Sequence, residues 1–155
     1  GVNYYTRSII KADKSEKNIG FKSIAGELPK TDMGWEIYPQ GLTKLLTRQI
    51  KNYSKNLPIH ITENGMANKD NLLNGVIEDK ERTNFFKLHL EEIRTLINHK
   101  VPIKSYFVWS LLDNFEWAFG FNKRFGLVHI DFKSQERVPK NSYYDFKEAL
   151  KAEKP

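Results

Sequence analysis

Apolar residues along the chain repeat at two spacings, which predict β-strands and α-helices in alternation. Three short apolar stretches are typical of strands: residues 1–5, 57–62 and 102–111. Three longer stretches repeat apolar residues every three or four positions, as helices do: residues 38–56, 79–100 and 141–153. Each strand is followed by a helix, and this order is typical of parallel strands joined by helical crossovers. The pattern therefore predicts an α/β fold.

The helix predicted over residues 79–100 has the clearest amphipathic pattern. Its apolar face is expected to consist of Phe86, Leu90, Ile93 and Ile97. Asp79 stands where an N-cap is expected, and Pro102 marks the end of the helix. The other segments are predicted loops: residues 13–38 with a hairpin inside, residues 64–77, and an aromatic stretch from the third strand to about Phe132. The third strand is apolar enough to be covered on both faces.

Composition narrows the class of protein. Hydrophobic residues make up 39% of the 155 residues and aromatic residues 13%, which is enough for a packed core. No apolar run reaches the roughly 18 residues that cross a membrane, and no secretory leader is visible. The net charge of +6 comes from Lys and Arg residues scattered among acidic ones, so we expect no nucleic-acid partner. The lack of cysteine is typical of a reducing compartment, and we expect a cytoplasmic protein.

Polar and aromatic residues gather at the predicted carboxyl ends of the three strands, where parallel α/β folds carry their chemistry. These residues are Asn3, Tyr5, Glu63, Trp109, Glu116 and Trp117. Indole rings suit the apolar face of a sugar ring, and carboxylates accept hydrogen bonds from its hydroxyls. The set therefore favours a carbohydrate site.

Each of these residues also has a structural interpretation. Glu63 could be an ion-pair partner, and Glu116 could be a solvated loop charge. Trp109 and Trp117 could belong to the core, as large aromatic residues usually do. His60 lies in the middle of a strand and is expected in the core. The histidines have no metal-ligand spacing and no glycine-rich phosphate loop is present, so we expect no metal and no other cofactor.

Longer motifs carry a resemblance to a known family. They are "NYYTRS" (residues 3–8), "ITENG" (61–65), "EDKERTNFFKLHL" (78–90) and "YFVWSLLDNFEWAFGFNKRFGLVHIDF" (106–132). Together these motifs resemble the C-terminal part of the glycoside hydrolase family 1 β-glucosidases. The resemblance implies a (β/α)₈ TIM barrel, of which residues 1–155 would be a single C-terminal segment without a second domain. That segment would be about three βα units, the sixth to the eighth, with long βα loops.

The resemblance also implies roles for residues at the strand ends. In the family, the Glu of Thr-Glu-Asn-Gly is the nucleophile, which falls on Glu63 and implies retaining hydrolysis of β-glucosides through a glycosyl-enzyme ester. The Tyr that donates a hydrogen bond to this carboxylate falls on Tyr5. Asn3, two residues earlier on the same strand face, is expected to line the same pocket.

Four further residues match the part of the family motif that binds the sugar. Trp109 corresponds to the platform under the ring, and Glu116 to the group that grips the 4- and 6-hydroxyls. Trp117 would donate its indole N–H to another hydroxyl, and Phe125 would wall the pocket. The related 6-phospho-β-glycosidases typically have a small residue where this chain has Glu116. The resemblance therefore implies a β-glucoside or similar sugar without a phosphate.

One part of the family pattern does not occur in this sequence. A retaining glycosidase needs a second carboxyl group, roughly 5 Å from the nucleophile, as acid/base. The family carries it in a Thr-x-Asn-Glu-Pro motif, which is absent here, and neither Glu116 nor Asp113 matches that motif. Three hypotheses stay open: part of a split or longer enzyme that an N-terminal chain completes, a catalytically inactive product, or a sugar-binding or oligomeric interaction module.

Three strands do not close a barrel. We therefore expect two open sheet edges and an exposed face on the side of the barrel interior. Open edges present unpaired backbone groups, so we also expect self-association through them.

Overall fold

The structure is a computed structural model that describes residues 1–15, 20–55 and 57–152. Three parallel strands form its central sheet, in which β4 (Ile59–Asn64) lies between β1 (Val2–Tyr4) and β5 (Ile103–Val108). The predicted α/β arrangement with parallel strands is thus confirmed.

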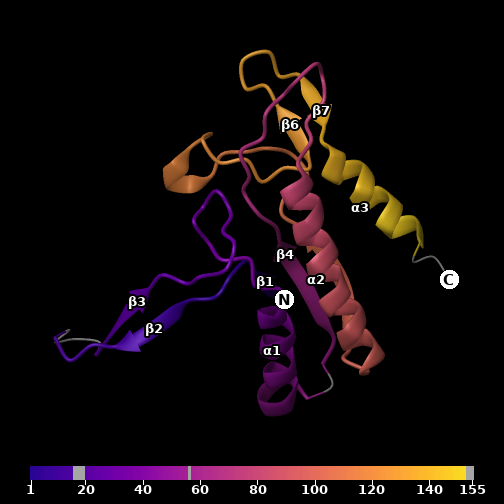
Figure 1. The fold of residues 1–155 in the computed structure, drawn as a ribbon. Coiled ribbons are helices and arrows are strands. Elements are labelled where there is room, and N and C mark those ends of the chain that lie inside the picture. The colour runs from indigo at the N-terminus through magenta and orange to yellow at the C-terminus, as the bar shows by residue number, and fades with distance from the viewer. Residues whose placement is uncertain (16–19, 56, 153–155) are drawn as a thin grey trace.

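Each strand of the central sheet is followed farther along the chain by a helix, as the spacing predicts. These are α1 (Gln40–Gln49), α2 (Lys80–Asn98) and α3 (Asn141–Ala152). The first ends earlier than expected, because the chain widens into a π-helical turn, Ile50–Ser54, in which the Lys55 N–H donates to the Ile50 carbonyl. Positions 56 and 153 of the predicted helices lie outside the described residues. Helix α2 packs against both α1 and α3, so the helices form one layer (Figure 1).

The hydrophobic core lies between this helical layer and one face of the sheet. Its larger cluster consists of Tyr4, Leu42, Leu46, Ile59, Ile61, Ile93 and Leu96. A second cluster nearer the carboxyl ends of the strands consists of Met66, Phe85, Phe86 and Leu127. Burial of aliphatic and aromatic side chains on this scale is the main force that holds the strand ends in place.

The buried face of α2 differs from the predicted one. Its buried residues are Arg82, Phe85, Phe86, His89, Ile93 and Leu96. Ile97 is 44% exposed and Leu90 is half-buried, because the helix is turned so that two polar residues face inward. Asp79 precedes the helix but makes no capping hydrogen bond, since its carboxylate binds Arg82 and Ser142 instead.

The opposite face of the sheet is open, as the sequence predicts for a partial barrel. His60 and Thr62 of β4 are exposed, and Phe107 of β5 is 55% exposed. Two predictions are therefore wrong: His60 is not in the core but contacts the Ser105 hydroxyl at 2.7 Å, and β5 is covered on one face only. Within the described residues, β1 and β5 each pair on one side alone.

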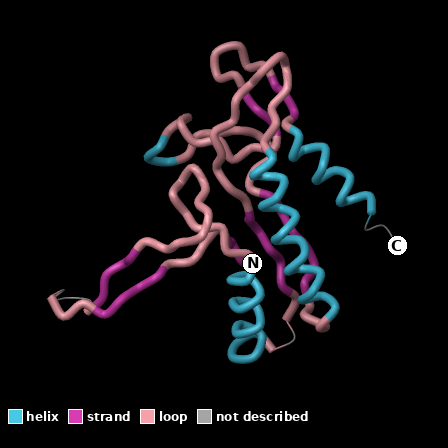
Figure 2. Tube along the Cα trace, in the orientation of Figure 1, coloured by secondary structure: helices cyan, strands magenta, loops and turns pink. Residues whose placement is uncertain are grey.

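Long connections extend beyond this body. An antiparallel arm of β2 (Ile9–Ala12) and β3 (Phe21–Ile24) projects away from the helices (Figures 1 and 2). The loop after β5 contains a short 3₁₀ turn, Trp117–Phe119, and leads to the β6 (Val128–Ile130) and β7 (Arg137–Pro139) hairpin.

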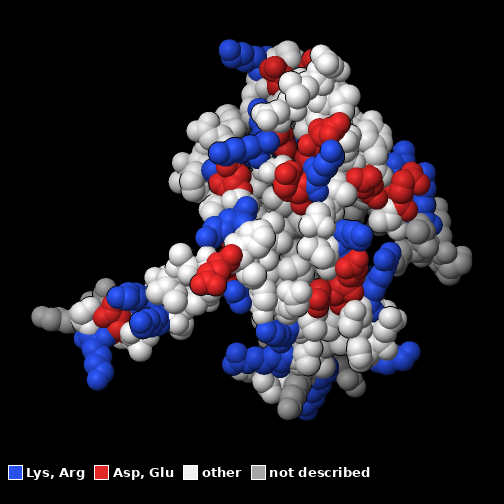
Figure 3. Space-filling view, in the orientation of Figure 1, with Lys and Arg blue, Asp and Glu red and all other residues white. Residues whose placement is uncertain are grey.

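Two properties concern the molecule's surroundings. On the face drawn in Figure 3, basic and acidic side chains alternate over the body of the protein. Among the helices that the structure describes, none combines the length and the apolarity needed to cross a bilayer.

Candidate active site

Glu63 stands at the carboxyl end of the central strand, as the penultimate residue of β4. Its neighbour across the sheet is β1, whose parallel register sets Tyr5 just beyond the strand's last residue. The Tyr5 phenol donates a hydrogen bond of 2.6 Å to Glu63 Oε2. Burial of the ring, and then the bond to Glu63, raise the pKa of the Tyr5 phenol well above its ordinary value. Tyr5 therefore stays a donor at any ordinary pH.

The residue after Glu63 ties the three strands together at this edge. Asn64 is fully buried; its Nδ2 donates to the Tyr4 carbonyl at 2.7 Å, and its Oδ1 accepts the Tyr106 hydroxyl at 2.6 Å. Gly65 follows because a Cβ there would lie 1.8 Å from the carbonyl oxygen of Trp109. The sequence predicts Asn64 in a loop, but it is the last residue of β4. Its buried hydrogen bonds fix the strand ends beside Glu63.

A cavity of about 630 Å³ opens next to the Tyr5–Glu63 pair. Its walls come from three separate connections and from the end of β4, and they are mostly aromatic. They are formed by Tyr5, Met33, Trp35, Glu63, Trp109, Asn114, Phe115, Glu116, Trp117, Ala118, Phe119 and Phe125. Six of the seven residues predicted from the sequence therefore surround one space. Asn3 does not line it; the side chain is exposed, and its Oδ1 accepts the Thr62 hydroxyl at 2.6 Å.

Glu116 lines the same space as Glu63. A tight turn holds it, since its N–H donates to Gly120 and its carbonyl accepts from Phe119. Burial, and then the negative charge of Glu63, raise the pKa of the Glu116 carboxyl. Next to it Trp117 is 83% exposed. The site thus combines two carboxylates with aromatic surfaces open to solvent.

Six wall residues were not predicted as site residues from the sequence. Two of them, Met33 and Trp35, come from the segment predicted to be a polar loop. Trp35 packs its ring on Tyr5, with centroids 5.6 Å apart, and on Phe125, with centroids 6.2 Å apart. Met33 lies beside it. The one available signal was a lone Trp in an otherwise polar stretch. No group of three or more His, Cys, Asp or Glu side chains among the described residues is arranged to hold a metal ion.

Solved structures place this fold in a class. A β-glucosidase from Exiguobacterium marinum superposes with a TM-score of 0.94 at 38% identity, over 99% of this chain and 34% of that one. The β-glucosidase from Thermotoga maritima in complex with glucoimidazole superposes with a TM-score of 0.91 at 40% identity, over 96% of this chain and 33% of that one. The chain thus has the fold of part of a β-glucosidase TIM barrel.

The chain belongs to glycosyl hydrolase family 1, whose family model matches residues 1–155. Beta-glucosidase A of Acetivibrio thermocellus is 47% identical over 153 residues, which cover 96% of this chain and 34% of that protein. The 6-phospho-beta-galactosidase of Clostridium acetobutylicum is 40% identical over 165 residues, which cover 95% of this chain and 35% of that protein. The chain thus spans about a third of the length of the curated relatives it matches.

Proposed function

We propose that this chain forms the sixth to eighth βα units of a retaining β-glucosidase, in which Glu63 is the nucleophile. The observation that carries the proposal is the bond from Tyr5 to Glu63 at the edge of an aromatic cavity. A carboxylate held by a phenol donor is fixed in direction, which suits attack on a single carbon atom of a bound sugar.

The proposed reaction has two steps. A Glu63 oxygen bonds to the anomeric carbon while the bond to the leaving oxygen breaks, which gives a glycosyl-enzyme ester; water then cleaves this ester with net retention. The leaving oxygen takes a proton from an acid/base carboxyl, which water later restores. We propose that this carboxyl lies on a barrel segment outside these residues, supplied by an N-terminal complementing chain or by the rest of a longer protein.

The cavity walls would bind the sugar. Trp109 offers an indole face to the ring, and Phe125, 2% exposed, closes the wall behind it. Glu116 would accept hydrogen bonds from the 4- and 6-hydroxyls, and Trp117 would donate one. Asn3, exposed on the open face, would reach the sugar only within a completed barrel.

Glu116 also bears on the choice of sugar. Identity alone does not decide it, because one relative is named a 6-phospho-beta-galactosidase. A carboxylate repels phosphate, so we propose a substrate without one. Calorimetric titration with glucose and with glucose 6-phosphate tests this, and tighter binding of the phosphate would rule it out.

The experiment that tests the nucleophile uses a 2-fluoroglucoside with a dinitrophenyl leaving group, which departs without an acid catalyst. The purified chain is incubated with it, weighed intact and digested. One fluoroglucosyl group on Glu63 is the expected result, and a Glu63→Gln variant should take up none. Folded protein without the adduct would contradict the proposal.

A second candidate function is a sugar-binding or oligomeric interaction module without turnover. The strong exposure of Trp117 favours it, because a solvent-facing indole is the surface that sugars contact. Calorimetric heat from glucose, together with an unlabelled Glu63, would support this module over the enzyme; no heat and no label would indicate an inactive product.

A further inference from the structure

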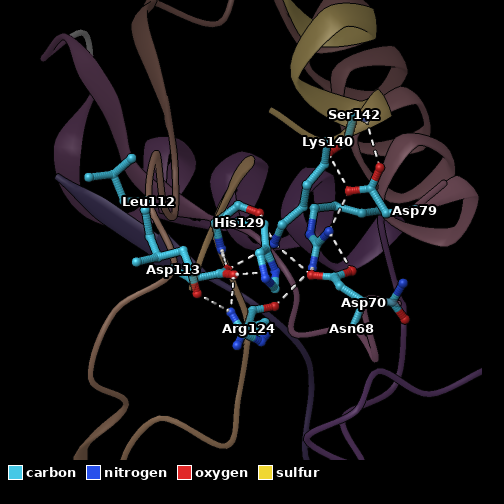
Figure 4. A network of polar contacts seen from close by, with 12 residues as sticks. Asn68, Asp70, Asp79, Leu112, Asp113, Arg124, His129, Lys140 and Ser142 are labelled. Atoms are coloured by element: carbon cyan, nitrogen blue, oxygen red, sulfur yellow. Dashed lines mark hydrogen bonds and ion pairs between the residues drawn. The ribbon is translucent and has the colours of Figure 1, made fainter. Parts of the chain in front are cut away.

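A cluster of buried charges joins four separate parts of the chain (Figure 4) and bonds to both neighbours of the wall residue Phe125. We call it the ionic cluster; it consists of Asp70, Asp79, Asp113, Arg82, Arg124 and Lys140. All of these side chains are fully buried except that of Arg124, which is 23% exposed. Charges out of water are costly unless each has partners, and here three acids meet three bases.

Lys140 is the centre of the ionic cluster. It stands between β7 and α3 and directs its ammonium group inward. Nζ donates to Asp70 Oδ2 at 2.6 Å, to Asp113 Oδ1 at 2.8 Å and to the Gly126 carbonyl at 2.6 Å. An ammonium group has three donors, so all of them are used.

The ionic cluster holds the backbone on both sides of Phe125. On one side, the Gly126 N–H donates to Asp113 Oδ1 at 2.9 Å, and the Gly126 carbonyl accepts from Lys140 Nζ. On the other side, the Arg124 carbonyl accepts a hydrogen bond from Arg82 Nη2 at 2.8 Å, while the Arg124 guanidinium donates to Asp113 Oδ2 at 2.7 Å. The backbone on both sides of Phe125 is therefore held by hydrogen bonds to the ionic cluster.

At position 126 two backbone segments approach each other very closely. A Cβ on Gly126 would lie 2.2 Å from the Asp113 nitrogen and 2.4 Å from the Leu112 carbonyl carbon, so only glycine lets the two segments approach so closely.

Phe125 contacts Tyr5, the hydrogen-bond partner of the candidate nucleophile. Its ring meets the Tyr5 ring edge-on, with centroids 6.1 Å apart and planes at 84°. Tyr5 in turn donates to Glu63. A shift of the segment around Phe125 would remove one of the two aromatic walls, Phe125 and Trp35, that fix the direction of the Tyr5 phenol.

We propose that Lys140 is a positioning residue: through the ionic cluster it holds Phe125 against Tyr5 and so orients the Tyr5–Glu63 pair. The inference rests on the proposed function only where it takes Glu63 as the reacting group. A cluster that served stability alone would leave the Tyr5–Glu63 geometry unchanged in any variant that still folds.

The test compares Lys140→Met with the parent chain by two readouts. The first is the rate at which the dinitrophenyl 2-fluoroglucoside labels Glu63, which should fall on the order of 100-fold, the effect of misplacing a reacting group by about 1 Å. The second is fluorine NMR of a fluorotyrosine at position 5. Its phenol should ionise at lower pH in the variant, because the bond to Glu63 loosens.

The matched control is Lys151→Met, which removes an exposed ammonium group paired with Glu148 on α3. It should change neither readout. A folded Lys140→Met variant with the parent's labelling rate and the parent's Tyr5 ionisation would overturn the proposal.

Two further outcomes are kept separate. If the parent chain is never labelled, the proposed function fails and the NMR readout alone decides on Lys140. If Lys140→Met does not fold, Arg124→Gln replaces it, because this side chain is partly exposed and Asp113 keeps Lys140 as a partner. Arg124→Gln should lower the pH at which Tyr5 ionises, and an unchanged value would overturn the proposal.

Discussion

The phenol oxygen of Tyr5 is hydrogen-bonded to the Glu63 carboxylate at 2.6 Å. Replacing Tyr5 by Phe removes that oxygen and keeps the ring. Because a hydrogen bond to a charged group contributes about 1.5–3 kcal/mol, we expect labelling of Glu63 by the fluoroglucoside to slow roughly tenfold to a hundredfold. Intact mass measured against time gives the rate. Tyr144→Phe, at an exposed position on α3, is the control, and equal rates for Tyr5→Phe and the parent would contradict the prediction.

His89 is a second residue whose surroundings set its behaviour. Its ring is fully buried and stacks on Phe85, with centroids 3.9 Å apart. Nδ1 lies 2.8 Å from the Phe85 carbonyl, which can only accept, so Nδ1 carries the proton. Nε2 is buried without a hydrogen-bond partner among the described residues. Burial lowers the pKa of His89 from 6.5 to about 4.

This lowered pKa predicts a pH-dependent stability. Above pH 6.5 the imidazole of His89 is neutral in both states, and its contribution is fully present. As the pH falls from 6.5 toward 4, the unfolded chain binds a proton that the folded chain excludes, so stability falls by up to about 3 kcal/mol. Urea unfolding at pH 7 and pH 4 measures the loss. The free energy of unfolding of His89→Phe should fall less than that of the parent over this range. His99→Gln, at an exposed position, should lose as much as the parent. If His89→Phe loses as much as the parent, the pH dependence does not come from His89.

At the scale of elements, two adjacent leucines on α1 separate burial from helix propensity. Leu46 is fully buried in the larger core cluster, whereas Leu45 is 41% exposed. Leu46→Ala should lower the free energy of unfolding by about 2–5 kcal/mol, because it leaves a cavity. Leu45→Ala should change it by less than about 1 kcal/mol. Chemical denaturation measures both, and similar losses would show that α1 does not pack as described.

The three central strands and the three helices could be predicted, in their order, because the spacing of apolar residues within each segment is enough to indicate its type. The β6–β7 hairpin could not, since β6 lies in a stretch that the sequence predicts as a loop. Which face of each helix or strand is buried could not be predicted. Ile97 has the spacing of a core residue and is exposed, while Arg82 and His89 are polar and buried. Phe107 is apolar and faces the open side of the sheet. Which face is covered depends on the helical layer and on the ion partners of Arg82, and both lie far away in sequence.

Some residues of the candidate site could likewise be predicted from the sequence, and others could not. Glu63 and Tyr5 stand at predicted strand ends, so both parallel pairing and the family motif bring them to one edge. Trp35 reaches that edge from a connection whose path no local pattern encodes. Lys140 contacts Asp70 across 70 positions, and its sequence neighbourhood does not distinguish it from a surface lysine.

At the scale of the whole molecule, the sheet has two unpaired edges within the described residues, at β1 and β5. Such edges template pairing with other strands. We therefore expect the isolated chain to self-associate at micromolar concentration, as light scattering would measure. Phe107→Lys, on the open face of β5, should reduce the association, because a charge on an edge strand opposes pairing. A clean monomer of the parent chain would contradict this prediction.

The three tryptophans of the chain, Trp35, Trp109 and Trp117, all line the cavity. The intrinsic indole fluorescence of the protein therefore originates from this one place. A ligand that entered the cavity would displace water from these rings and change the emission without any attached dye. Local loosening of the cavity loops would likewise change the tryptophan emission before the core unfolds. Intrinsic fluorescence therefore reports on this cavity rather than on the core.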